Sequence, residues 1–173
     1  MSEPKPRRRI AIDLDDTLID GSGRKRPGAN TFLNGIEERG FEPVLYTTSR
    51  RQHVDKVLER NPSFKDRFGC VFTSENAPRY GREKIEEAER LGQEGRARVM
   101  RLVDDGYAGG KDPGLVGADV LVDDFVDEEV VDQLGFGYVQ VRPPKLDSTG
   151  SWAIEALKDV DDVLRELQGW SGE

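Results

Sequence analysis

Short apolar runs alternate with amphipathic stretches along this chain. The apolar runs have the length and composition of buried strands, and they lie at 10–12, 43–48, 71–73, 118–122 and 138–142. The stretches with helical spacing lie between and after them, at 31–40, 51–60, 81–92, 127–134 and 151–167, while 98–103 fits either element. Strands separated by helices predict an α/β fold with a doubly wound, Rossmann-like parallel sheet and helices on both faces.

The length of 173 residues suits a single domain. We expect residues 1–9, rich in proline and arginine, to form a flexible N-terminal tail. Residues 10–168 then form the domain, with a small insertion near 78–105. Gly40 stands where the helix at 31–40 must end, a position that favours glycine.

Charge and composition limit the partners of the protein. The formal net charge is −8, so nucleic acid is not an expected partner, except as a phosphorylated polynucleotide end. The single cysteine, Cys70, excludes an internal disulfide and fits a reducing compartment, and the single histidine, His53, excludes a His-rich zinc site. No apolar run approaches the roughly 20 residues of a membrane span, so we expect a cytoplasmic protein without a membrane partner.

Polar side chains follow the strands of the predicted sheet. In such sheets ligands bind at the carboxyl ends of the strands, so these residues are the candidates for chemistry. They are Asp13 and Asp15 after the first strand, Thr47 and Thr48 at the end of the second, Lys111 before the fourth, and Asp123 and Asp124 after it.

The segments that carry these residues resemble the motifs of the haloacid dehalogenase (HAD) superfamily, in the same order. Within it, the chain is most similar to capless phosphatases of the NLI-interacting-factor and polymerase C-terminal-domain type. The matching segments span about two-thirds of the chain and read IDLDDTL (12–18), RPGANTFL (26–33), VLYTTS (44–49), GKDPGLVG (110–117) and VLVDDF (120–125).

The resemblance implies a phosphomonoester hydrolase that works through an aspartyl-phosphate. Asp13 would be the nucleophile, and Asp15 would protonate the leaving oxygen and then activate water. Thr47 and Lys111 would bind the phosphoryl group. Whether Thr47 or Thr48 faces it is a question of one residue in strand register, and the spacing of the TTS segment favours Thr47.

The same resemblance implies a metal cofactor. Several carboxylates around a dianionic phosphate would repel it, so a cation is needed, and oxygen ligands favour Mg²⁺. Its expected ligands are Asp13, the backbone carbonyl of Asp15, and either Asp123 or Asp124.

Other residues compete for these roles. Asp104-Asp105 also follows an apolar run, but Asp123-Asp124 is followed by a helix and a strand at the expected distance. Lys84 competes with Lys111, although its Glu-rich surroundings favour surface ion pairs. We interpret the arginines at 7–9 and 24–26 as a solvated surface, and His53 as a residue of the helix surface or the core.

Access to the predicted site bears on the substrate. Residues 19–46 leave no room for a full cap domain beside a helix and a strand, although the insertion near 78–105 could act as a lid. An open site suits a macromolecular phosphoester, such as a phosphoprotein or a polynucleotide end, and it suits a phosphorylated small molecule if an oligomer partner closes the site. The alternatives are a nucleotide, polynucleotide-end or sugar-phosphate phosphatase, and a non-catalytic phosphate-binding protein of the same fold.

Overall fold

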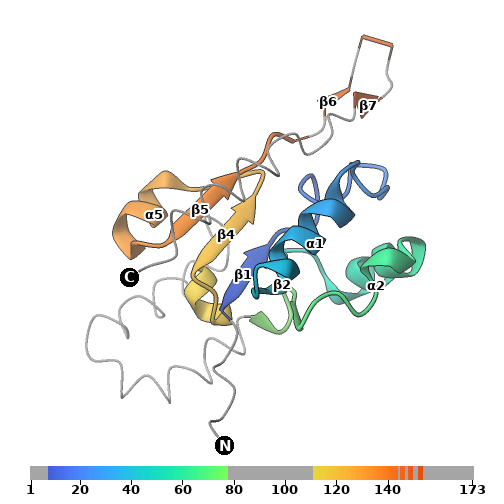
Figure 1. The fold of residues 1–173 in the computed structure, drawn as a ribbon. Helices are drawn as coiled ribbons and strands as arrows, with labels where there is room; N and C mark the ends of the chain where they lie inside the picture. Colours follow the sequence, from blue (N-terminus) through green and yellow to red (C-terminus); the bar gives the residue numbers. More distant parts are fainter. Residues whose placement is uncertain (1–7, 78–110, 144, 147, 150–151, 154–173) are drawn as a thin grey trace, which may run out of the picture.

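The computed structural model describes residues 8–77, 111–143, 145–146, 148–149 and 152–153 (Figure 1). Five strands form one parallel sheet in the order β3-β2-β1-β4-β5. Their bounds are β1 (Arg9–Ile12), β2 (Glu42–Tyr46), β3 (Cys70–Phe72), β4 (Val120–Asp123) and β5 (Gly137–Gln140). This order, with helices between the strands, confirms the predicted doubly wound α/β class.

The register of the sheet determines where the polar residues emerge. In the central strand β1, Ile12 lies opposite Leu45 of β2 and opposite Val122 of β4. All three strands run in the same direction, so the residues that follow them come out at one edge of the sheet. We call this edge the carboxyl edge.

Successive side chains along the strands point to opposite faces of the sheet, which produces two apolar layers. Ile10 and Ile12 of β1 belong to the layer beneath α1 (Ala29–Glu38) and α2 (Arg51–Arg60). Ala11, between them, points to the opposite face, where it packs in a layer with Val116 of the short 3₁₀ helix η3 (Pro113–Val116). A buried strand must be apolar on both faces, which explains the unbroken apolar runs in the sequence.

The helices end where their residues require it. α1 buries Phe32, Leu33 and Ile36, and Gly40 follows its C-cap with a φ of 81°, as expected for a helix terminated by glycine. α2 buries Val54 and Val57 and stops before the 3₁₀ helix η1 (Pro62–Phe64). α5 (Glu128–Leu134) lies beside β5, at the opposite end of the sheet from α2 (Figure 1).

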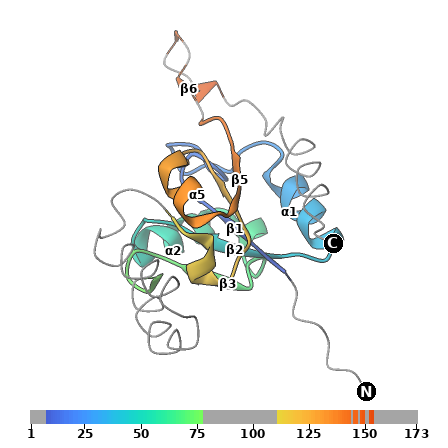
Figure 2. The same cartoon turned by 90° about the vertical axis from the view of Figure 1, so that its left-hand side faces the viewer.

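The structure differs from the sequence expectations near both ends. β1 begins at Arg9, one residue inside the expected tail. Trp152–Ala153, expected to open a helix at 151–167, instead forms strand β7, which pairs antiparallel with β6 (Lys145–Leu146). Figure 1 shows this pair standing apart from the five-stranded sheet, and Figure 2 shows β6 apart from it in a second view.

Several expectations fall outside the described residues. These are the tail at 1–7, the helix at 81–92, the segment 98–103, the whole insertion near 78–105, and the C-terminal helix beyond 153. Between β1 and β2, where every residue is described, the chain forms only tight turns and α1, which leaves no cap domain at that position. Among the described residues no helix is long and apolar enough to span a bilayer.

Candidate active site

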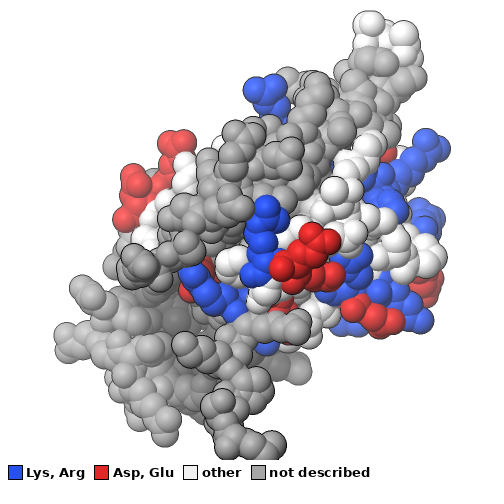
Figure 3. Space-filling view, in the orientation of Figure 1, with Lys and Arg blue, Asp and Glu red and all other residues white. Residues whose placement is uncertain are grey.

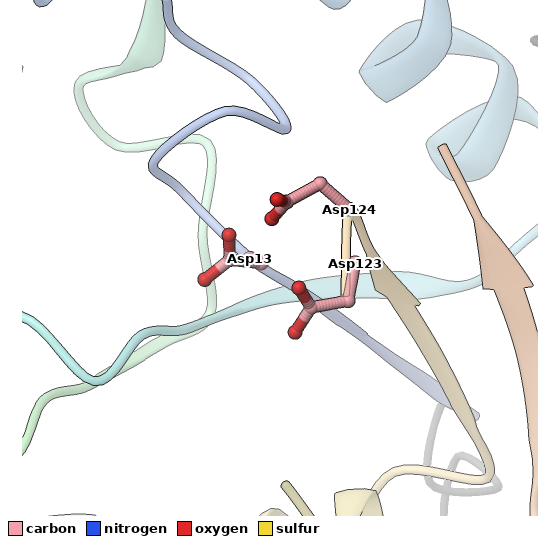
Figure 4. Close-up of side chains that lie close together, drawn as sticks. All are labelled: Asp13, Asp123 and Asp124. Atoms are coloured by element: carbon pink, nitrogen blue, oxygen red, sulfur yellow. The ribbon is translucent and has the colours of Figure 1, made fainter. Parts of the chain in front are cut away.

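The carboxyl edge brings three aspartates together (Figure 4). The Asp13 N–H donates to the carbonyl of Val122 at 2.9 Å, which extends the β1–β4 pairing past Ile12 and sets Asp13 beside the end of β4. Carboxylate oxygens of Asp13, Asp123 and Asp124 lie within 4.8 Å of one another, and the first two residues are buried. The two strand ends thus create a concentrated negative charge.

Lys111 partly neutralises this charge. Its buried ammonium donates to Oδ1 of Asp13 and, at 2.8 Å, to Oδ2 of Asp123. The position of Lys111 is secured by the next residue, because the Asp112 carboxylate accepts the Gly114 N–H at 2.8 Å and so caps η3. A buried lysine between two carboxylates is a compact cation at the point where a phosphoryl group would bring further negative charge.

Burial and crowding perturb the pKa values of the cluster. Burial raises the pKa of Asp13 to about 7, against the attraction of Lys111 and together with repulsion from Asp123. Burial, followed by repulsion from Asp123, raises the pKa of Asp124 to about 6. Burial alone would lower the pKa of Lys111, but the two carboxylates that it contacts raise it above its usual range. One ammonium therefore does not offset three carboxylates.

The donor set fits a hard divalent cation, and the contacts separate the two candidate ligands on β4. Both oxygens of Asp123 have protein partners, because Oδ2 accepts from Lys111 and Oδ1 accepts the Phe125 N–H at 3.1 Å. Asp124 and Oδ2 of Asp13 instead lie near the hydroxyl group of Thr17. Oxygen ligands with surplus negative charge suit Mg²⁺. Asp124 could serve as a direct ligand of such an ion, whereas Asp123 anchors Lys111.

Thr17 connects the two strand ends, a role that sequence reasoning missed. Its hydroxyl oxygen accepts the Asp124 N–H at 3.0 Å and lies 3.2 Å from Oδ2 of Asp13. The turn that returns Thr17 to the site contains Asp16 with a φ of 62°, a left-handed conformation tolerated by aspartate. The available signal was its spacing, four residues after Asp13 in a turn-forming segment.

Asp15 lies apart from the acidic cluster and faces the start of α2. Its Oδ2 accepts from the Ser49 hydroxyl at 2.7 Å, and its Oδ1 lies 2.6 Å from Nε2 of His53. Both contacts were missed from the sequence, where His53 was interpreted as a surface or core residue. The available signal was the position of His53 in the first turn of a helix that directly follows a strand end.

Burial separates the two candidate threonines, which follow the end of β2. Thr47 is buried, and its hydroxyl oxygen accepts the Ser49 N–H at 3.1 Å. Thr48 is exposed, in the bend that follows β2. The structure thus places Thr47, and not Thr48, within the buried part of the carboxyl edge.

The interpretation of the basic cluster as a solvated surface is wrong for Arg26. Only 2% of this residue is exposed, and its guanidinium donates to the carbonyl of Asp16 at 2.9 Å. Arg26 therefore supports the turn that carries Asp15 and Thr17. Arg9 is also partly buried, in an ion pair of 2.6 Å with Glu42. Figure 3 shows basic and acidic side chains intermingled on one face, over α1 and α2.

The competing candidates lie outside the described residues. Lys84 and Asp104-Asp105 fall within 78–110, so the structure does not compare them with Lys111 and Asp123-Asp124. Within the described ranges, the predicted residues Asp13, Lys111, Asp123 and Asp124 lie together.

Three comparisons with known proteins were made. Neither the known protein families nor the curated proteins give a match. A solved structure described as "The Structure of Fcp1, an essential RNA polymerase II CTD phosphatase" is similar with a TM-score of 0.44 and 17% sequence identity. The match covers 95% of this chain and 49% of that chain, so this chain spans about half the length of its structural neighbour. The α/β class of this protein rests on its own strand order and register.

Proposed function

We propose that this protein is a Mg²⁺-dependent phosphomonoester hydrolase that works through an aspartyl-phosphate on Asp13. The observation that carries the proposal is the buried contact of Asp13 with Lys111, next to Asp123 and Asp124 at the carboxyl edge. Phosphoryl transfer needs an in-line nucleophile, neutralisation of charge and a proton donor for the leaving oxygen. This edge offers a residue for each requirement.

In the first step, a carboxylate oxygen of Asp13 attacks phosphorus and the bond from phosphorus to the alcohol oxygen breaks. The Asp15 carboxyl gives its proton to that oxygen, which leaves as the alcohol. Lys111 holds the attacking carboxylate in place and offsets the charge of the transferring group. A Mg²⁺ ion held by Asp13, Asp124 and the backbone carbonyl of Asp15 would supply further charge neutralisation at the phosphoryl oxygens.

In the second step, water attacks phosphorus while the Asp15 carboxylate accepts its proton. The bond between phosphorus and Asp13 breaks, which releases inorganic phosphate and restores both carboxyl groups to their starting states. Thr47, buried beside this edge, is the proposed hydrogen-bond donor to a phosphoryl oxygen. The net reaction consumes one water and one phosphomonoester.

The test is hydrolysis of p-nitrophenyl phosphate with Mg²⁺ and with EDTA. We expect activity with Mg²⁺ only, and a loss of about 10³-fold or more in kcat for Asp13→Asn, as is typical when a catalytic nucleophile is removed. The matched control is Asp132→Asn, the same change at an exposed position of α5. Unchanged activity in Asp13→Asn would contradict the assignment of the nucleophile.

The substrate class follows from a second measurement on the active protein. Phosphate release from a panel of phosphoserine peptides, sugar phosphates, nucleotides and oligonucleotides with phosphorylated ends separates the phosphoprotein and small-molecule alternatives. Binding of inorganic phosphate without turnover of any member would instead favour the phosphate-binding alternative.

A further inference from the structure

Among the described residues, His53 and Ser49 make side-chain contacts that hold Asp15. Nε2 of His53 lies 2.6 Å from Oδ1 of Asp15, and with the hydrogen on Nε2 the ring N–H donates to the carboxylate. The Ser49 hydroxyl donates to the other oxygen, Oδ2, at 2.7 Å. Because both oxygens are held, the plane and the direction of the Asp15 carboxyl group are fixed.

The two partners come from the segment that follows β2 and are themselves well anchored. The Ser49 N–H donates to the hydroxyl of Thr47, and the Ser49 carbonyl accepts the Ser74 N–H at 3.1 Å. His53 lies in the first turn of α2, where its backbone N–H donates to the Arg50 carbonyl at 3.0 Å. Val54, the next residue, is fully buried. The side chains of His53 and Asp15 are 46% and 39% exposed, so solvent reaches the contact.

We propose that His53 is a positioning residue for proton transfer, which orients the Asp15 carboxyl group toward the leaving oxygen of the substrate. The inference rests on the proposed function, because it assigns His53 a part in the proton transfer ascribed there to Asp15. A protonated carboxyl group has one O–H donor and keeps acceptor lone pairs on its oxygens, so Asp15 can accept from His53 and Ser49 and still donate its proton to the substrate. His53 touches neither phosphorus nor the leaving oxygen in this scheme.

The consequence is a specific dependence on the leaving group. In the first step the proton moves from Asp15 to the alcohol oxygen as its bond to phosphorus breaks. A poor leaving group needs this proton, whereas a strongly acidic phenol leaves without it. Displacement of Asp15 therefore slows the hydrolysis of phenyl phosphate more than that of 2,4-dinitrophenyl phosphate. Damage to the fold slows the hydrolysis of both equally.

The experiment measures kcat/KM, which reports the steps up to formation of the phosphoenzyme, for a series of aryl phosphates of graded leaving-group acidity. For His53→Phe we expect kcat/KM to fall about 10-fold more for phenyl phosphate than for 2,4-dinitrophenyl phosphate. This loss is a part of the roughly 10²–10⁴-fold acceleration that a general acid supplies. His53→Gln keeps an N–H at a similar distance from the backbone and should restore most of the loss. Asp15→Asn should give the steepest dependence.

The controls separate this inference from the proposed function. Gln52→Ala changes an exposed neighbour on α2 and should keep the wild-type dependence on the leaving group. If Asp15→Asn steepens the dependence and His53→Phe leaves it unchanged, or slows every substrate equally, the inference on His53 is overturned and the proposed function stands. If Asp15→Asn also has no effect on the dependence, or the wild type is inactive, both are overturned.

Discussion

At the scale of single residues, hydrogen bonds to Asp20 stabilise a turn beside the candidate site. Asp20 lies in the turn that follows Asp15 and Thr17, and it is almost fully buried. Its Oδ1 accepts from the Ser22 hydroxyl at 2.6 Å and from the N–H groups of Ser22 and Arg24 at 2.9 and 3.0 Å. Burial alone would raise the pKa of Asp20, but these hydrogen bonds hold it below its usual range.

This lowered pKa gives a stability prediction with a definite sign. A carboxylate whose pKa is lower in the folded than in the unfolded state stabilises the fold above the unfolded pKa, and the gain is lost as pH falls through the folded value. Asparagine keeps a neutral acceptor oxygen, so Asp20→Asn should cost about 1 kcal/mol at pH 7, the difference between hydrogen bonds to a charged and to a neutral acceptor. The cost should be smaller below about pH 4. Urea unfolding at pH 7 and pH 3 measures the difference, and an equal cost at both values would contradict this explanation.

At the scale of the element, α1 ends by a mechanism that can be tested without disturbing packing. Gly40 has a φ of 81°, and its N–H donates to the Glu37 carbonyl at 2.9 Å. A Cβ at this position would meet no atom within 4 Å, so only the backbone conformation disfavours a side chain. Gly40→Ala should cost about 1 kcal/mol in the free energy of unfolding.

The matched variant is Gly40→Asn, because asparagine tolerates the left-handed conformation better than alanine does. In chemical denaturation the wild type should have the highest free energy of unfolding, Gly40→Asn a lower one and Gly40→Ala the lowest. Equal stability of the alanine variant would mean that the helix end rearranges.

The elements were largely predictable from the sequence, whereas the contacts between them were not. The strands at 10–12 and 118–122 and the glycine after α1 follow from local patterns, and so does the placement of polar residues after the strands. The contact of His53 with Asp15 depends on the orientation of α2 relative to β2, which no residue spacing specifies. Arg26 has the local sequence of a solvated arginine, and only the tertiary fold surrounds it with carbonyl groups.

At the scale of the whole molecule, the charge of Asp124 within the acidic cluster opposes folding when no metal ion is bound. The pKa of Asp124 is raised to about 6 by burial and by Asp123, so its charge destabilises the metal-free fold at pH 7.5. Asp124→Asn should raise stability in EDTA by about 1 kcal/mol, or roughly 2–4 °C in Tm, a modest value because solvent reaches Asp124 and screens its charge.

Mg²⁺ should reverse this order, because an ion that binds only the folded state adds stability in proportion to its occupancy. Thermal unfolding with EDTA and with excess Mg²⁺ measures both effects. The Tm of the wild type should rise with Mg²⁺ by more than that of Asp124→Asn. Equal shifts in the two proteins would argue against Asp124 as a ligand.

The order of strands in the sheet has a consequence for how the chain acquires its site during folding. Arg9 and Glu42, in the β1–β2 pair, are 33 positions apart, whereas Asp13 and Lys111 are 98 positions apart. Closing a loop three times longer costs about 1 kcal/mol more in chain entropy, so β1 and β2 are expected to pair before β4 docks. Asp13 then stays hydrated until late, and the segment that buries it also delivers Lys111. The chain thus never has to bury that carboxylate before its counterion arrives.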